Sequence, residues 1–326
     1  MNKKEKNQID ASPGKAAKVV VIGCGSVGST YVYAIMQTGL AREIVIIDVD
    51  KKRLEGEVLD LSHGLFFVPP VIIRPGDYSD CAGADLIVIT AGAKQAPGQS
   101  RIELVRRNAE IVGSICRNIK TVDTSAVLVM VTNPVDILTC LALKHLDWPK
   151  RRIIGSGTVL DSARFRYMLS RHCGIDTRNV HAYILGEHGD SEVPAWSMTH
   201  IAGVPVKQYC GSCLRCDSDK THQQITRQVR DSAYHIIDYK GSTYYAIGVS
   251  LVRISAAILR NEHSVLTVSA FLDGEYNIRD VCLSVPCVIG SSGIERIITA
   301  LLSPAEQNDL EKSACALREV LSSLKS

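Results

Sequence analysis

The stretch Lys18–Gly28, KVVVIGCGSVG, decides the fold of this chain, because a short β-branched run ends directly in a glycine-rich turn. Apolar residues at helical spacing follow from Thr30 to Met36, and a second apolar run from Glu43 to Ile47 ends in Asp48. Strand, glycine turn, helix, strand and acid come in the order of a dinucleotide-binding βαβ unit. We therefore expect a nucleotide cofactor at this turn.

The glycines of the turn and the acid after it have separate tasks. Gly23 and Gly25 permit the tight turn and a close approach of the backbone to a pyrophosphate, whereas Gly28 lets the helix pack on the strand. Asp48 lies about 20 residues beyond Gly28, where a carboxylate can accept both ribose hydroxyls and repel a 2′-phosphate. The sequence therefore predicts NAD, rather than NADP, as the cofactor.

Strands and helices continue to alternate up to residue 155, which is typical of a parallel sheet covered by helices on both faces. The expected helices cover Leu54–Ser62 and 104–115, and the expected strands cover Val71–Arg74, Asp85–Thr90 and Ala126–Val131. Polar loops follow several of these strands, at the sheet edge where such folds bind ligands. We predict an α/β protein with an N-terminal doubly wound parallel sheet of the Rossmann type.

The pattern changes after Gly155-Ser156-Gly157, where strands and helices mix. The expected helices are Asp161–Arg171, Asp219–Tyr239, Ser242–Leu259 and Pro304–Leu324 (opened by Ser303), and the expected strands are Asn179–Leu185 and the antiparallel Ser264–Leu272 and Val281–Ile289. We predict a flexible N-terminal tail (residues 1–17), an NAD-binding Rossmann domain (18–155) and an α+β substrate and catalytic domain (156–326).

Composition indicates a globular protein and excludes several classes. The 326 residues are 46% hydrophobic and 22% charged, as in ordinary folded domains. A net charge of +3 is too small to indicate nucleic acid or an anionic membrane as a partner, and no apolar run has the length of a membrane span. The N-terminus lacks the apolar segment of a secretory signal, and the eleven cysteines are scattered and odd in number. We expect a cytoplasmic protein with reduced thiols.

A histidine between two glycines, in Gly186-Glu187-His188-Gly189-Asp190, is the main candidate for chemistry. An imidazole on a turn that follows an apolar strand can meet a ligand, and its pKa lies near neutral pH. The motif alone decides little, since a histidine in a polar turn is more often plain surface. Upstream, however, Asp161-Ser162-Ala163-Arg164 offers a carboxylate to orient the ring and a guanidinium to hold an acid.

Together these motifs resemble the L-lactate/malate dehydrogenase superfamily, most specifically its bacterial, NAD-dependent lactate branch. The matching segments come in the family order along nearly the whole chain: Gly23–Gly28, Thr90–Ala93, Gln95–Arg101, Thr132–Asp136, Asp161–Arg164, Gly186–Asp190 and Ser284–Pro286. Chance does not readily produce so many motifs at compatible spacing.

The resemblance implies reversible reduction of pyruvate to L-lactate, as in fermentation, with His188 as proton donor and, in reverse, as base. Asp161 would bond the other ring nitrogen and raise the pKa of His188. Arg164 would hold the substrate carboxylate with a two-pronged bond. Arg101, on a loop that contains glycine and proline, would polarise the carbonyl when that loop closes and expels water.

The resemblance also implies which residues shape the substrate pocket. Asn133 and Thr243 match substrate-contacting positions, and Gln95 matches the position that sets substrate choice. Malate-converting members carry arginine there, to pair the second carboxylate of oxaloacetate. Because Gln95 is neutral, a second negative charge would be buried without a partner, at a cost of several kcal/mol. We therefore expect lactate rather than malate as the hydroxy acid.

Further positions match the family's NAD contacts around the pyrophosphate, ribose and nicotinamide. Besides the glycine turn and Asp48, the firmer matches are Val27, Gly92, Ala93, Val131, Asn133 and Ser156, and the weaker ones are Arg53, Tyr78 and Ser114.

Three other interpretations of the function stay open: a malate or broader 2-hydroxy-acid dehydrogenase, an NAD-dependent glycosidase, and a non-catalytic NAD-binding protein. A glycosidase of that kind needs a metal site made of cysteine and histidine side chains. A non-catalytic NAD-binding protein does not need a proton donor with an acid and arginines beside it.

Arg166 and His181 resemble the pair that binds fructose bisphosphate at a subunit interface in many bacterial members. Two cationic groups that meet across a two-fold axis suit a sugar with two phosphates. The same two residues also occur in members without this effector. The resemblance thus implies a homotetramer and leaves activation by the bisphosphate open.

One segment departs from the family pattern: Cys210-Gly211-Ser212-Cys213-Leu214-Arg215-Cys216 has the cysteine spacing of a metal site. Only three thiols are present, whereas structural zinc takes four ligands. His222 could supply a fourth, but it lies inside a predicted helix. We predict no metal here, and whether the loop is incidental or redox-sensitive stays open.

Overall fold

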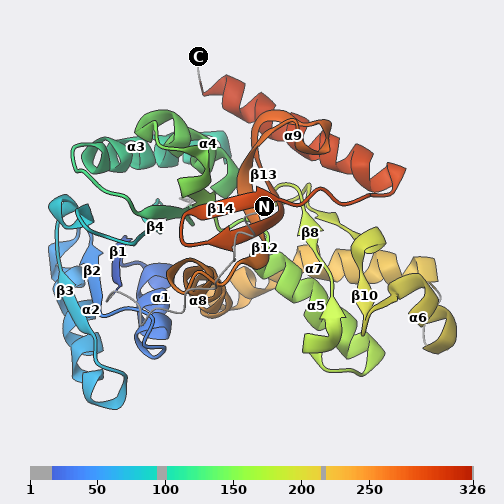
Figure 1. The fold of residues 1–326 in the computed structure, drawn as a ribbon, viewed down its shortest axis with the longest axis horizontal. Coiled ribbons are helices and arrows are strands. Elements are labelled where there is room, and N and C mark those ends of the chain that lie inside the picture. Colours follow the sequence, from blue (N-terminus) through green and yellow to red (C-terminus); the bar gives the residue numbers. More distant parts are fainter. Residues whose placement is uncertain (1–16, 94–100, 214–217, 325–326) are drawn as a thin grey trace, which may run out of the picture.

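A nine-stranded sheet runs through the computed structural model of the protein, which describes residues 17–93, 101–213 and 218–324 (Figure 1). Its strands lie in the order β14-β13-β12-β6-β5-β4-β1-β2-β3. Six are parallel: β1 (Lys18–Ile22), β2 (Glu43–Ile47), β3 (Ile72–Pro75), β4 (Leu86–Ile89), β5 (Val127–Met130) and β6 (Ile153–Gly155). The strand order reverses between β1 and β4, the position at which open α/β sheets bind ligands.

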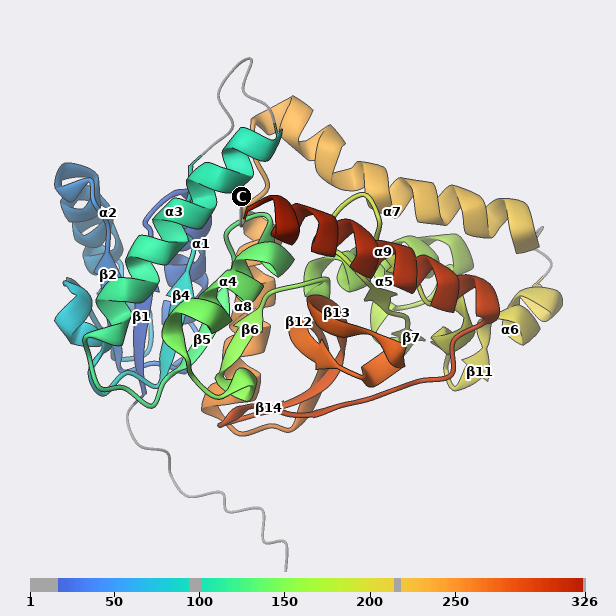
Figure 2. The same cartoon turned by 90° about the horizontal axis from the view of Figure 1, so that it is seen from above.

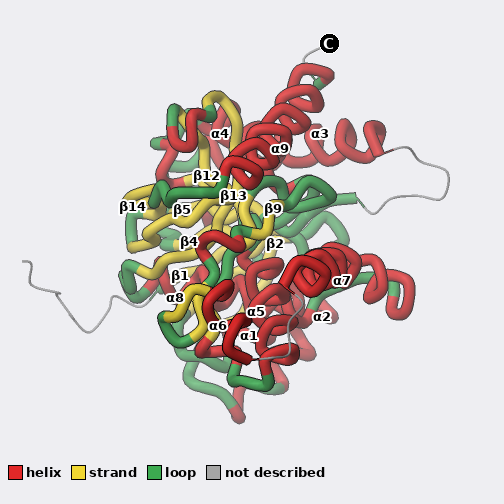
Figure 3. The backbone as a smooth tube through the Cα atoms, turned by 90° about the vertical axis from the view of Figure 1, so that its right-hand side faces the viewer, coloured by secondary structure: helices red, strands yellow, loops and turns green. Residues whose placement is uncertain are grey.

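Helices cover both faces of this sheet (Figures 1 and 3). They are α1 (Ser26–Met36), α2 (Lys51–His63), α3 (Arg101–Lys120), α4 (Val135–Leu146), α5 (Val159–Cys173), α6 (Val206–Cys213), α7 (Ser218–Lys240), α8 (Tyr245–Leu259) and α9 (Pro304–Ser323). In β1, Val19 and Val21 belong to the core shared with α1 and α8, whereas Val20 and Ile22 belong to the core shared with α3 and α4. A strand buried on both faces reads as one apolar run, which is how β1 reads.

The second half of the chain extends the same sheet with antiparallel strands. They are β12 (Ser264–Asp273), β13 (Arg279–Gly290) and β14 (Gly293–Ile297), so the antiparallel pair predicted there is present. β12 joins β6 where Ser269 pairs with Gly155, and a Cβ on Gly155 would lie 2.6 Å from Ser269 Cβ. One sheet therefore continues across residue 155 instead of ending there.

The single strand predicted over Asn179–Leu185 is wrong. β7 (Val180–His181) pairs with β10 (His200–Ile201), which pairs with β11 (Val204–Pro205), while β8 (Ile184–Leu185) pairs with β9 (Val193–Pro194) in a separate sheet. The chain changes sheets at Ala182, whose carbonyl accepts a hydrogen bond from Arg166 Nε at 2.9 Å. A side chain stands there in place of a neighbouring strand, so the ladder is interrupted.

The helices predicted in the second half of the chain begin close to the expected residues. Two of them, α7 and α9, extend across the part of the molecule that this half forms (Figure 2). Ser303 Oγ accepts the Glu306 N–H, and the Glu306 carboxylate accepts the Ser303 N–H, so α9 opens with a capping box. α4 and α6 are additional to the predicted helices. Eight of the twelve residues of α4 are buried, so its sequence shows no single apolar stripe. Within the described ranges, no helix combines the length and apolarity needed to span a bilayer.

Candidate active site

The glycine turn leaves room for a phosphate group beside Gly25. A Cβ on Gly23 would lie 2.5 Å from Ala91 N, and one on Gly28 would lie 1.9 Å from Gly23 O, so the turn packs against β4 and α1 as only glycine allows. A Cβ on Gly25 would meet no atom within 4 Å, and no side chain caps α1 there. Open space before an uncapped helix N-terminus fits the pyrophosphate of NAD.

Asp48 follows β2 and holds the same turn. Its Oδ2 accepts the Cys24 N–H at 2.6 Å, and its Oδ1 accepts the Asp50 N–H at 2.9 Å. Burial alone would raise the pKa of this carboxyl, but the two backbone hydrogen bonds and the nearby Arg53 charge hold the pKa below its usual value. Asp48 is therefore anionic at neutral pH, which suits ribose hydroxyls and disfavours a 2′-phosphate.

Residues from three neighbouring strand ends share the carboxyl edge of the sheet. They are Gly92 and Ala93 after β4, Val131 and Asn133 after β5, and Ser156 after β6. Buried Asn108 of α3 ties two of these ends together, because its Oδ1 accepts the Ala93 N–H and its Nδ2 donates to Asn133 O, both at 2.8 Å. Sequence reasoning misses Asn108, since in the sequence it is one polar residue within a helix.

The weaker cofactor matches have ordinary structural surroundings. Arg53 on α2 bridges Glu57 at 3.5 Å. Tyr78 packs against the core on the α3 side of the sheet, and burial raises its pKa. Ser114 is exposed on α3. Val27, one of the firmer matches, is half-buried on α1. The cofactor roles of these residues stay predictions.

His188 lies in a row of three side chains. Its ring Nδ1 is 2.5 Å from Asp161 Oδ2, and Asp161 Oδ1 accepts a hydrogen bond from Arg164 Nη1 at 2.8 Å. Asp161 and Arg164 come from adjacent turns of α5. The Asp161 side chain is 3% exposed and that of His188 is 26% exposed, so the imidazole can be reached from outside while its acid partner cannot.

Charges within this row move two pKa values in opposite directions. The Asp161 charge raises the pKa of His188 to about 9, against burial, which would lower it. Burial would raise the pKa of Asp161, but the charges and hydrogen bonds of His188 and Arg164 hold that pKa below its usual value. At neutral pH the stable forms are therefore the imidazolium and the carboxylate.

The loop that carries His188 is held by elements far along the chain. Gly186 adopts φ +89°, a conformation that favours glycine, and exchanges two backbone hydrogen bonds with Ser284 of β13, at 2.9 and 3.0 Å. The next N–H, of Glu187, donates to Ser313 Oγ of α9 at 2.8 Å. β13 and α9 therefore fix where the histidine stands.

Glu192, on the same loop, is a buried acid that sequence reasoning misses. It is 6% exposed, and its Oε1 has no hydrogen-bond partner among the described residues. Burial raises its pKa to about 8, and the Asp161 charge acts in the same direction. Glu192 is therefore mostly neutral at pH 7 and adds little negative charge beside the row.

The structure places some of the predicted substrate residues and leaves others out. Gln95 lies outside the described residues, as does the Arg101 side chain, although Arg101 opens α3. Asn133 is exposed directly before Pro134, and Thr243 is half-buried just ahead of α8. The expectations for Gln95 and Arg101 therefore rest on the sequence alone.

The predicted effector pair lies around β7. Arg166, on α5, donates from Nε to Ala182 O, and its guanidinium lies 5.0 Å from the centre of the Tyr183 ring. His181 is exposed on β7. The arginine is thus partly engaged within its own subunit, whereas the histidine faces outward.

The cysteine segment is only partly described. Cys210 is buried in α6, while the Cys213 side chain and Cys216 fall outside the described residues. The part of the chain that the structure covers contains no group of three His, Cys, Asp or Glu side chains able to hold a metal. The absence of a metal at the cysteine segment stays a prediction.

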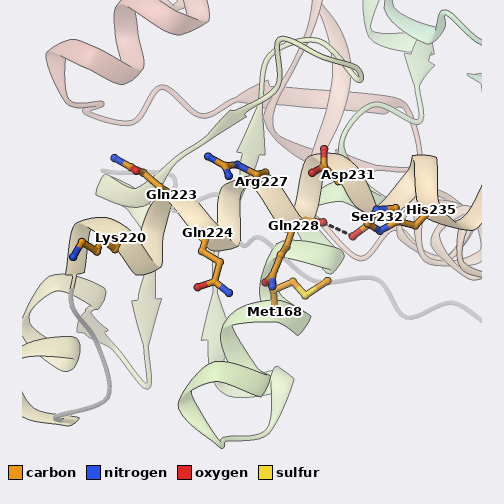
Figure 4. Close-up of a pocket in the computed structure, with 9 residues that line it drawn as sticks. All are labelled: Met168, Lys220, Gln223, Gln224, Arg227, Gln228, Asp231, Ser232 and His235. Carbon is orange, nitrogen blue, oxygen red and sulfur yellow. Dashed lines mark hydrogen bonds between the residues drawn. The ribbon is translucent and has the colours of Figure 1, made fainter.

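A hollow of about 550 Å³ runs along α7 (Figure 4). Polar side chains of α7, among them Gln223, Gln224 and Gln228, make up most of its lining, and Met168 of α5 adds an apolar contact. Its lining includes neither the histidine of the row nor the two α5 residues beside it. The row and this hollow are therefore separate features.

The nine-stranded sheet carries a turn that fits a dinucleotide after β1, and its strand β13 holds the loop of an acid-bound histidine; together these features define an NAD-dependent dehydrogenase. Residues 17–155 match the family described as lactate/malate dehydrogenase, NAD binding domain, and residues 158–326 match lactate/malate dehydrogenase, alpha/beta C-terminal domain. The chain belongs to the lactate/malate dehydrogenase family.

Individual relatives agree with this assignment. The chain is 54% identical to the L-lactate dehydrogenase of Treponema denticola over 95% of its length and 99% of the relative's, and 51% identical to that of Acetivibrio thermocellus over 94% and 97%. It superimposes with a TM-score of 0.93 on MGS-M5, a lactate dehydrogenase enzyme from a Medee basin deep-sea metagenome library, at 43% identity over 96% and 100% of the two chains. The resemblance, the fold class and the NAD prediction are confirmed.

Proposed function

We propose that the protein catalyses the NAD-dependent, reversible reduction of pyruvate to (S)-lactate. The row of Arg164, Asp161 and His188 carries this proposal, because it offers a carboxylate-binding group and a proton donor side by side. Curated relatives that share about half of the residues along nearly the whole chain are named L-lactate dehydrogenase, which supports the same activity.

In this mechanism bound NADH supplies the hydride. His188 donates its proton to the carbonyl oxygen of pyruvate and takes it back during lactate oxidation. Asp161 keeps Nδ1 protonated and the ring oriented, so Nε2 is the nitrogen that exchanges the proton. Arg164 binds the substrate carboxylate, since a planar guanidinium can bond both oxygens. Arg101 polarises the carbonyl that receives the proton.

Two groups of residues at the carboxyl edge of the sheet would hold NAD. The turn residues Gly23, Gly25, Val27 and Gly28 would hold the pyrophosphate, and Asp48 would hold a ribose. Further contacts would come from Gly92, Ala93, Val131, Asn133 and Ser156, and weaker ones from Arg53, Tyr78 and Ser114. In this proposal residues 18–155 form the NAD-binding domain, and residues 156–326 form the substrate domain that shares its sheet.

Substrate choice follows from Gln95, so the enzyme should prefer pyruvate to oxaloacetate. We expect kcat/KM for pyruvate to exceed that for oxaloacetate by at least about 100-fold, because the second carboxylate would be desolvated beside a neutral amide. Steady-state loss of NADH absorbance with each oxo acid measures this ratio. The variant Gln95→Arg is the matched control and should move the preference toward oxaloacetate. A higher efficiency of the unmodified enzyme with oxaloacetate would show that the substrate assignment is wrong.

We further propose a homotetramer that fructose bisphosphate activates through Arg166 and His181. Phe66 and Phe67 expose 90% and 82% of their surface and Val249 exposes 64%, and exposed apolar side chains of this size are typical of subunit interfaces. Adding the bisphosphate at neutral pH should lower KM for pyruvate or favour the tetramer in analytical ultracentrifugation. If neither pyruvate affinity nor the oligomer distribution changes, the activation proposal is wrong.

We also propose that the protein works in the cytoplasm. Seven of the described cysteines carry free thiols, and all of these except Cys315 are buried: Cys24, Cys81, Cys116, Cys140, Cys282, Cys287 and Cys315. Several free thiols in one chain are typical of proteins kept in a reducing compartment.

A further inference from the structure

Asp136 lies behind the loop of His188, in the first turn of α4. It is 2% exposed. The His188 backbone N–H donates to Asp136 Oδ2 at 2.8 Å, and Ser284 Oγ donates to Asp136 Oδ1 at 3.5 Å. A carboxylate that accepts a backbone N–H in a buried place makes a strong, short bond. Asp136 therefore holds the peptide of the histidine, as Asp161 holds its ring.

The three consecutive N–H groups of this loop have different kinds of anchor. Gly186 bonds a backbone carbonyl of β13 and Glu187 bonds the hydroxyl of Ser313, so both of these anchors are neutral. The third anchor, Asp136, is the charged one of the set. It stands three residues after Asn133, at the end of β5, so it links the loop to the strand end that carries a predicted substrate and cofactor contact.

The charges around Asp136 favour an ionised carboxylate close to an imidazolium. Burial raises the pKa of Asp136 to about 6, and the Glu187 charge acts in the same direction, while the Ser269 hydroxyl lowers it first and the His188 backbone N–H and the His188 charge lower it further. From β13, the buried thiol of Cys282 faces it, with a pKa raised well above its usual value by burial. At neutral pH Asp136 is therefore mostly anionic, and its charge raises the pKa of His188 in addition to the larger effect of Asp161.

We propose that Asp136 is a second positioning carboxylate for the proton donor, holding the His188 peptide and stabilising its imidazolium by its buried negative charge. The proposal rests on the proposed function, in which His188 transfers the proton. Its physical basis is that one buried carboxylate has two effects. Its hydrogen bond to the His188 backbone N–H fixes the position of the residue that carries the ring, and its negative charge favours the protonated form of the ring.

The variant Asp136→Asn separates charge from hydrogen bonding, because its amide oxygen can still accept the His188 N–H. We expect kcat for pyruvate reduction to fall by about 10- to 100-fold, with the dissociation constant of NADH unchanged. We also expect the alkaline limb of the pH profile to move to lower pH by about half a unit or more, since an anion has been removed near His188. A purely structural role for Asp136 would lower activity without moving this limb.

Ser313→Ala is the matched control, since it loosens the same loop at Glu187 without removing a charge. It should lower kcat modestly and leave the alkaline limb in place. If Asp136→Asn does not fold, Asp136→Glu keeps the charge while displacing the oxygen, and it should lower kcat with the limb unmoved. An unchanged kcat and an unchanged limb in the asparagine variant, or a moved limb in the glutamate variant, would overturn the role of Asp136.

A measurement that needs no turnover distinguishes this proposal from the function itself. Proton NMR titration of the His188 ring, assigned by comparison with His188→Asn, reads its pKa directly in wild type and in Asp136→Asn. We expect a lower His188 pKa in the Asp136→Asn variant, and an equal pKa in the two proteins would overturn the role of Asp136. Absence of pyruvate reduction by the wild type would instead overturn the proposed function.

Discussion

The His188→Asn variant should lose at least about 1,000-fold in kcat for pyruvate reduction while still binding NADH, because removal of a positioned general acid has effects of this order. Asparagine keeps a polar side chain but is shorter than histidine and has no acidic proton to deliver. The backbone bond from residue 188 to Asp136 and the glycine turn do not depend on the ring. Stopped-flow turnover and NADH fluorescence titration measure the two quantities separately.

The pH profile adds a second check on the same residue. Because Asp161 raises the pKa of His188 to about 9, the imidazolium should support pyruvate reduction up to that pH and fail above it. Lactate oxidation needs the neutral ring, so it should rise through the same range. The matched control is His263→Asn, since His263 Nδ1 also meets a carboxylate, Glu295 Oε2 at 2.7 Å, but on the exposed surface. Normal turnover by the His188 variant would show that another group supplies the proton.

Local patterns made part of this site predictable. β2 coincides with the strand expected from the sequence, and Asp48 follows it, because the strand, the turn and the acid lie within one short segment. The capping box of α9 is likewise legible, since Ser303 and Glu306 are three residues apart. Asp161 and His188 are 27 residues apart, so their residue types suggest a carboxylate–imidazole pair, but no local pattern fixes it, and the resemblance to a family is what implies the bond.

Long-range packing explains what the sequence does not show. The pairing of β6 with β12 depends on the contact between Gly155 and Ser269, and neither segment carries a local pattern that predicts the other as its partner. In the sequence, Asp136 is one acid in a segment that looks like a polar loop. In the structure it belongs to α4, which is buried on most sides and places the carboxylate against the His188 backbone N–H. The split between β7 and β8 follows from a side-chain hydrogen bond to Ala182 that periodicity cannot reveal.

Replacing Arg164 by lysine should raise KM for pyruvate by at least about 100-fold, although the positive charge is kept. A lysine ammonium is a compact charge on a flexible stem, whereas guanidinium can bond two carboxylate oxygens in one plane, and charge-assisted pairs of that kind contribute several kcal/mol in a desolvated place. The Arg164 side chain is 13% exposed, so water cannot fully replace the lost contacts. NADH affinity should not change, since the glycine turn and Asp48 are untouched.

The same substitution should also lower kcat, because Arg164 Nη1 bonds the carboxylate that orients His188. A shift of the alkaline limb would report this second effect, while the rise in KM reports the first. Arg178→Lys is the matched control: Arg178 bonds Asp176 at 2.8 Å, but its side chain is 90% exposed, and a solvated pair of this kind contributes little. If Arg164→Lys and Arg178→Lys gave the same KM for pyruvate, Arg164 would not be the group that binds the substrate carboxylate.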